Sequence, residues 1–112
     1  MALGAAGRIG PSMLEIAATE HPRGLRLTGE IDLDTAAQLT AALEPQVVQG
    51  GDLTLDLAGV RFIGSTGVQV LIRTAESLAD RGRLVLVNPG RGVRRLVEVM
   101  GLDRLENLEV RT

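Results

Sequence analysis

The chain has 112 residues, 45% of them hydrophobic, and a formal net charge of −2 at pH 7. A chain of this length can bury one continuous core, so we expect a single domain. The sequence has no cysteine, which excludes disulfides and thiolate metal sites. Its slight negative charge and its lack of tryptophan and tyrosine argue against direct nucleic-acid binding. No apolar run is long enough to span a bilayer, so we expect a cytoplasmic protein without a membrane contact.

The beginning of the chain predicts a tail followed by a hairpin. Residues 1–11 are small and glycine-rich and end at Pro11, which favours a flexible tail ahead of one domain over 12–112. Two short apolar runs, 13–18 and 24–28, flank the turn-like stretch around His21. They predict two paired strands.

A helix and a third strand are expected next. Helical spacing relates the apolar residues Ala36, Leu39, Leu43 and Val47. Asp34 is placed to cap this helix, and Pro45 is expected to kink it or to end it one turn early. Leu53, Leu55 and Leu57 then alternate with polar residues as in a half-buried strand, which we expect to stop near Ala58-Gly59.

The second half of the chain continues the alternation of helices and strands. A helical apolar stripe covers 68–79, the continuous apolar run 84–87 predicts a buried strand, a third helix is expected over 93–100, and a short strand over 105–110. This order predicts an α/β sandwich, with a mixed sheet of four to five strands covered mainly on one face by helices. Its last strands should be parallel and joined by right-handed crossovers.

The most distinctive local feature is the stretch 56–68, where a strand passes through a turn into a helix that begins at Ser65. The first N–H groups of a helix are unpaired and carry partial positive charge, so a phosphate added there would be stabilised. Gly64 and Gly67 are expected to leave the serine sterically open. Serine at a helix start is also a common cap, and geometry alone favours that simpler role.

Two segments together resemble the signature of the STAS domain, the fold of bacterial anti-sigma factor antagonists. The first is Gly29-Glu30-Ile31-Asp32, followed by Ala36 and Leu39. The second is Asp56-Leu57-Ala58, followed by Val60, Phe62, Ile63, Ser65, Thr66 and Gly67. The resemblance covers nearly all of 13–110 and implies a STAS-like sandwich.

The resemblance also implies a function and a site. In this family the serine that matches Ser65 is phosphorylated by a cognate anti-sigma factor, which is also a GHKL-type serine kinase. The unphosphorylated antagonist binds this partner and so frees a sigma factor. The implied partner-binding residues are Asp32, Gly64, Ser65, Thr66 and Gly67, with Ser65 as the phosphoacceptor. No cofactor, metal ion or small-molecule substrate is implied.

One difference from the family keeps two versions of this switch open. The family usually has aspartate just before the serine, where this chain has Gly64. Ser65 is therefore either phosphorylated or part of a surface that binds its partner constitutively. An alternative class of function is a STAS module that senses or scaffolds by binding a small ligand, nucleotide, lipid or protein. A hydrolase is disfavoured because His21, the one histidine, lies in an expected turn, so we expect no enzyme activity.

Overall fold

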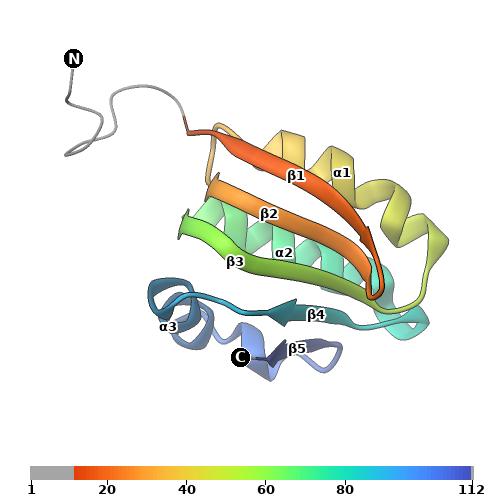
Figure 1. Cartoon of the computed structure of the whole chain (residues 1–112). Helices are drawn as coiled ribbons and strands as arrows, with labels where there is room; N and C mark the ends of the chain where they lie inside the picture. The colour runs from red at the N-terminus through yellow and green to blue at the C-terminus, as the bar shows by residue number, and fades with distance from the viewer. Residues whose placement is uncertain (1–11, 112) are drawn as a thin grey trace, which may run out of the picture.

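The computed structural model describes residues 12–111, and the tail expected at residues 1–11 lies outside this range. Figure 1 shows the arrangement of the elements. In chain order they are β1 (Leu14–Glu20), β2 (Arg23–Ile31), α1 (Ala36–Gln49), β3 (Leu53–Ile63), α2 (Ser65–Leu78), the 3-10 helix η2 (Ala79–Arg81), β4 (Leu84–Val87), α3 (Arg91–Val99), the 3-10 helix η3 (Leu102–Arg104) and β5 (Leu108–Arg111).

The five strands form one mixed sheet, as the sequence predicts. Their spatial order is β1-β2-β3-β4-β5. The first two strands form an antiparallel hairpin, and every later strand runs parallel to its predecessor after a helical crossover. The carboxyl ends of β2 and β3 therefore meet at the same edge of the sheet.

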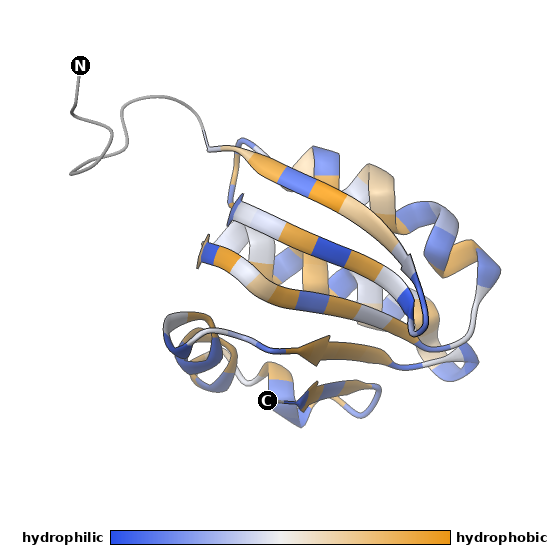
Figure 2. Ribbon diagram, viewed as in Figure 1, coloured by the Kyte–Doolittle hydropathy of each residue, from blue (hydrophilic) through white to orange (hydrophobic). Residues whose placement is uncertain are grey.

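The two faces of the sheet differ in polarity. Helices α1 and α2 lie side by side against one face, behind the strands in Figure 1. Leu27, Leu55 and Leu86 belong to the core on that side and are fully buried. Figure 2 shows hydrophobic and hydrophilic residues alternating along β2 and β3, whereas β4 is hydrophobic throughout. The polar residues of this alternation include Arg26 and Asp56, whose side chains lie 3.7 Å apart.

Strand β3 is longer than the sequence predicts. It continues past Ala58-Gly59 to Ile63, so the expected stop is wrong. The pairing of β2 with β3 shifts register twice, between Arg26 and Thr28 and between Gly29 and Glu30. These irregularities break the strict alternation of buried and exposed residues, which is the pattern that identifies a strand in a sequence.

Helix α1 differs from the expectations at both of its ends. Pro45 lies inside the helix, which continues to Gln49, so the proline does not end it one turn early. Pro45 and Ala41 are both exposed, so water can satisfy the carbonyl group that the missing proline N–H leaves without a partner. The N-cap is Thr35, no side chain caps the helix, and the Asp34 carboxylate instead accepts a hydrogen bond from the Ser12 backbone N–H at 3.0 Å.

Candidate functional site

Two loops meet where β2 and β3 leave the sheet. Ile31 and Ile63 are paired across the strands, and the Gly64 N–H donates to the Ile31 carbonyl oxygen at 2.8 Å. The chain then turns into α1 on one side and into α2 on the other. This pairing brings the loop that carries Asp32 against the turn that carries Ser65.

Ser65 is the first residue of α2 and is exposed to solvent. Gly64 occupies the N-cap position, and no side chain caps this helix. Within the described chain, the Ser65 hydroxyl makes no hydrogen bond. The common capping role of a serine at a helix start therefore does not apply, and the hydroxyl is accessible at the positive end of the helix dipole.

Gly64 lies directly between Ser65 and the Asp32 loop. Its backbone is extended, with φ −96° and ψ −179°, a conformation open to any residue. A Cβ atom added here would lie 3.4 Å from the Asp32 Cβ and 3.4 Å from the Phe62 ring. A Cβ atom therefore fits at this position in ordinary van der Waals contact, so the backbone here does not require glycine.

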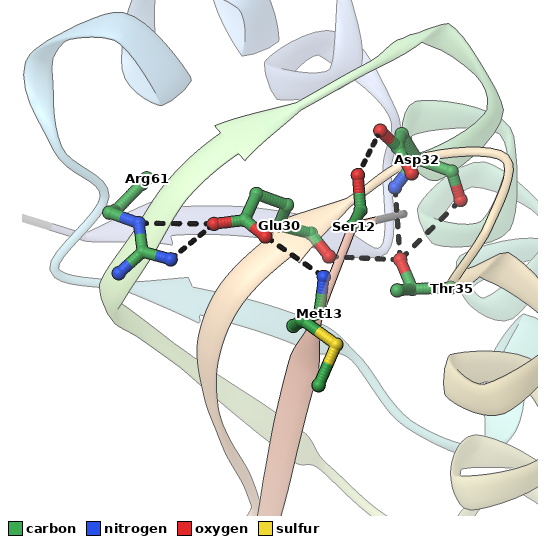
Figure 3. Close-up of polar contacts among 6 residues, drawn as sticks. All are labelled: Ser12, Met13, Glu30, Asp32, Thr35 and Arg61. Atoms are coloured by element: carbon green, nitrogen blue, oxygen red, sulfur yellow. Dashed lines mark hydrogen bonds and ion pairs between the residues drawn. The ribbon is translucent and has the colours of Figure 1, made fainter. Parts of the chain in front are cut away.

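Asp32 is half-buried, and both of its carboxylate oxygens accept hydrogen bonds, of which Figure 3 shows the one from Ser12. Oδ2 accepts from the Ser12 hydroxyl at 2.6 Å, and Oδ1 accepts from the Asp34 N–H at 3.2 Å. The Asp32 N–H donates to the Thr35 Oγ1 at 3.1 Å. These contacts fix the orientation of the carboxylate beside Gly64.

Thr66 and Gly67 are less exposed to solvent than Ser65. Thr66 is half-buried, whereas Gly67 is buried. A Cβ atom on Gly67 would lie 2.6 Å from Ile31 Cγ2 and 2.9 Å from Ile63 Cγ1. The expectation that Gly67 opens space around the serine is therefore wrong. This glycine lets α2 approach the ends of β2 and β3, and it can serve the site only through that packing.

Apolar side chains that the sequence reasoning did not assign to the site surround it. Phe62 is 50% exposed and its ring lies against Gly64, while Leu33, between Asp32 and Asp34, is 77% exposed. Exposed large hydrophobic residues are the expected mark of an interaction surface when they cluster. Phe62 carried a signal, since it is the one aromatic residue of the chain. We call Asp32, Leu33, Phe62, Gly64, Ser65 and Thr66 the switch face.

His21 lies far from the switch face. It is exposed in the turn between β1 and β2, and this turn precedes Arg23, the first residue of β2, whereas the switch face follows Ile31, the last. The strand between them is about 26 Å long at the usual rise per residue. A dyad of Ser65 with His21 is therefore excluded. Among residues 12–111, no three potential metal ligands converge, and no helix is long and apolar enough to cross a membrane.

The fold and its exposed serine define a STAS domain. The family model described as "Mlab, STAS domain" matches residues 14–109. A crystal structure of an anti-sigma factor antagonist from Mycobacterium paratuberculosis matches with a TM-score of 0.79 and 30% identity, covering 87% of this chain and 86% of that one. Unphosphorylated SpoIIAA, also an anti-sigma factor antagonist, matches with a TM-score of 0.68 and 27% identity, covering 90% and 88%. A Bacillus SpoIIAA structure in the phosphorylated form is also similar.

A relative found by sequence similarity indicates which kind of STAS protein this chain resembles. RsfB of Mycobacterium tuberculosis, an anti-sigma-F factor antagonist, is 38% identical over 81 residues, or 71% of this chain. The match covers 66% of RsfB, so it spans slightly less than two thirds of that relative's length. The chain belongs to the STAS domain family, and the relatives and solved structures that it resembles include anti-sigma factor antagonists.

Proposed function

We propose that the protein is a non-enzymatic antagonist that binds a cognate anti-sigma factor through the switch face and so frees a sigma factor. The observation that carries this proposal is the accessible Ser65 hydroxyl at the start of α2, directly after Gly64, which lies against both Asp32 and the exposed Phe62 ring. The antagonists named above support the choice of partner class. The switch face combines exposed apolar side chains with a polar centre, as protein interfaces do.

Phosphorylation of Ser65 is the proposed off-switch. A phosphate adds about two negative charges at pH 7. The positive end of the α2 dipole would stabilise the phosphate on Ser65, whereas the same charge would have to be buried within the switch face when the partner covers it. The fold therefore tolerates the modification while the interface does not. Because SpoIIAA is known in both forms, such a modification is compatible with this fold.

The proposed kinase is the anti-sigma factor itself, of the GHKL type, acting in the cytoplasm. The direct test incubates the protein with the candidate kinase and ATP, and locates the phosphate by mass spectrometry. We expect one phosphate on Ser65 in the wild type and none in Ser65→Ala. Modification confined to residues other than Ser65 and Thr66 would refute the phospho-switch.

Binding is tested separately from phosphorylation. Ser65→Asp should weaken binding to the anti-sigma factor by about 100-fold or more, since a charge would be buried unpaired in the interface. Ser77→Ala, an exposed serine at the other end of α2, is the matched control and should bind as the wild type does. Constitutive binding, the second version of the switch, predicts strong binding with no phosphorylation by the kinase.

One observation favours the alternative function, a STAS module that binds a small ligand. A hollow of about 440 Å³ lies between α1 and α2, and both apolar residues, such as Leu43 and Val70, and polar ones, such as Glu44 and Arg73, line it. These residues lie outside the switch face. Native mass spectrometry of the purified protein tests this alternative. A stoichiometric bound compound, together with unchanged partner affinity in Ser65→Asp, would favour it over the antagonist role.

A further inference from the structure

The beginning of β1 contacts the switch face through a network centred on a buried carboxylate. Glu30 is 2% exposed, although it lies next to the open end of the sheet. Its Oε1 accepts a hydrogen bond from the Met13 N–H at 2.9 Å. Its Oε2 accepts from Arg61 Nε at 3.1 Å and also forms an ion pair with the Nη2 of Arg61 (Figure 3).

Backbone contacts between the end of β2 and Met13 reinforce this network. The Glu30 N–H donates to the Met13 carbonyl oxygen at 2.8 Å, which continues the pairing of β1 with β2 by one residue. Gly29 has a φ of +117°, and a Cβ atom there would lie 2.2 Å from that same oxygen. Only glycine combines this conformation with this close approach. Met13 is therefore held on both sides by Glu30, through its N–H and through its carbonyl group.

Holding Met13 fixes the residue before it. Ser12 donates from its backbone N–H to Asp34 Oδ2 at 3.0 Å and from its hydroxyl to Asp32 Oδ2 at 2.6 Å. The distance of 2.6 Å is that of a strong hydrogen bond to an ionised acceptor. Ser12 thus bridges the two carboxylates on either side of Leu33, at the edge of the switch face.

We propose that Ser12 is a positioning residue of the switch face, which orients the Asp32 carboxylate through its hydroxyl and is itself held in place by the Glu30–Arg61 pair. The inference rests on the proposed function for its effect on partner binding. It extends the functional surface from the loops after β2 and β3 to the start of β1, where Met13 is 68% exposed. Partner affinity should then depend on a residue 53 positions before the phosphoacceptor in the sequence.

The first test needs no partner. Amide chemical shifts are compared by NMR among the wild type, Ser12→Ala, Ser12→Thr and the control Ser77→Ala. We expect Ser12→Ala to shift the amides of Asp34 and Gly64, since both lie against Asp32. Ser12→Thr keeps the hydroxyl and should restore the wild-type shifts. Unmoved Asp34 and Gly64 amides in Ser12→Ala, or equal shifts in Ser12→Thr, would overturn the proposal.

A second variant tests the role of the buried pair. Glu30→Gln keeps the shape of the side chain and an acceptor oxygen but removes the charge that Arg61 meets. We expect it to move the same two amides, by smaller amounts than Ser12→Ala. Changes confined to Met13 and Arg61 would show that the pair does not act on Asp32.

The third measurement is partner affinity, by calorimetry with the cognate anti-sigma factor. Because the hydrogen bond from Ser12 holds Asp32 in place and does not itself cross the interface, only about 0.7–1.4 kcal/mol of its free energy should appear in binding, which makes Ser12→Ala bind about three- to tenfold weaker. Ser12→Thr should stay within about twofold of the wild type. Unchanged affinity in Ser12→Ala, with equal unfolding free energy, would overturn the proposal. A wild type that binds no anti-sigma factor would refute the proposed function instead, and the amide shifts would still judge the positioning role.

Discussion

The two ends of the sheet differ in how completely the chain satisfies its own polar groups. At the end opposite the switch face, the Arg23 guanidinium donates to the carbonyl oxygens of Gln46, Gly50, Gly51 and Asp52. We call these five residues the closed end. At the switch face, the Ser65 hydroxyl has no internal partner among the described residues, and Leu33 and Phe62 face solvent. One end is built to hold the fold together, and the other is left available to a partner.

The closed end can be broken with one substitution, for which we expect the largest effect. Arg23→Ala removes a half-buried cation from four backbone carbonyl groups and should lower the free energy of unfolding by about 2–4 kcal/mol. Urea denaturation should show a lower midpoint with an unchanged slope. Partner affinity, measured on the folded fraction, should stay at the wild-type value.

Arg26→Ala is the matched control for this prediction. Arg26 lies on the same strand, but its side chain is 62% exposed and has one distant ion pair with Asp56. Its loss should cost about 0.5 kcal/mol or less. Equal destabilisation by the two variants would contradict the view that the closed end is a special stabilising region.

Gly67, which is buried next to the switch face, gives the next largest effect. Gly67→Ala places a methyl group 2.6 Å from Ile31 Cγ2 and should destabilise the fold by about 1–3 kcal/mol, because α2 must move away from β2. Gly92→Ala is the control. It lies in α3 with no atom within 4 Å of the new Cβ, so it should be neutral or slightly stabilising. The midpoint temperature of thermal unfolding should therefore fall for Gly67→Ala. For Gly92→Ala it should stay unchanged or rise slightly.

The sequence predicted most of the helices and strands at both ends of the sheet, but it did not predict the side-chain contacts between them. Leu53, Leu55 and Leu57 identified β3 because one of its faces is buried throughout that stretch. The same rule failed beyond Leu57, where the strand shifts register against β2 and the alternation is lost. Hydrophobic periodicity identifies the regular part of a strand but not an irregular end. The switch face lies at the irregular end of β3.

The contacts of the site escaped prediction for a related reason. Glu30 and Arg61 are 31 residues apart, and their pairing depends on the register of β2 with β3. Asp34 has the local signature of a helix cap, but Ser12, 22 residues earlier, uses its carboxylate. The position of Ser65 at the start of a helix was predicted correctly, because a helix start is a local property of the sequence. The absence of a capping bond from its hydroxyl within residues 12–111 could not be predicted locally, because Gly64 occupies the N-cap position.

Gly64→Asp tests the switch face, and its effect on stability should be smaller than that of Gly67→Ala. The extended backbone and the 3.4 Å contacts allow the new side chain, so the unfolding free energy should change by about 1 kcal/mol or less. The variant carries the acidic residue that the resemblance to the family implies at this position, and we expect the proposed kinase to phosphorylate Ser65 faster. The rate is measured by phosphate incorporation, with Gly64→Asn as the uncharged control. Equal rates in all three proteins would show that the aspartate plays no part in recognition here.

The smallest effect is expected at Glu109, which belongs to neither end of the sheet. A hydrogen bond from the Arg111 side chain lowers the pKa of the Glu109 carboxyl below its ordinary value of 4.5, against an opposing contribution from burial. A lowered pKa in the folded state means that this carboxylate stabilises the fold above its unfolded pKa, and that this contribution is lost as the pH falls through the folded pKa. Glu109→Gln should therefore be slightly less stable than the wild type near pH 7, and the difference should vanish in strong acid.

Urea titrations of both proteins between pH 7 and pH 3 measure this difference. Since the residues concerned are on β5, partner affinity and Ser65 phosphorylation should be those of the wild type at every pH where the protein is folded. A stability difference that grows towards acid would reverse the expected sign and show that Arg111 does not stabilise the ionised form. An effect on binding would mean that the polar face of the sheet also contacts the partner, and the functional surface would then not be confined to one end.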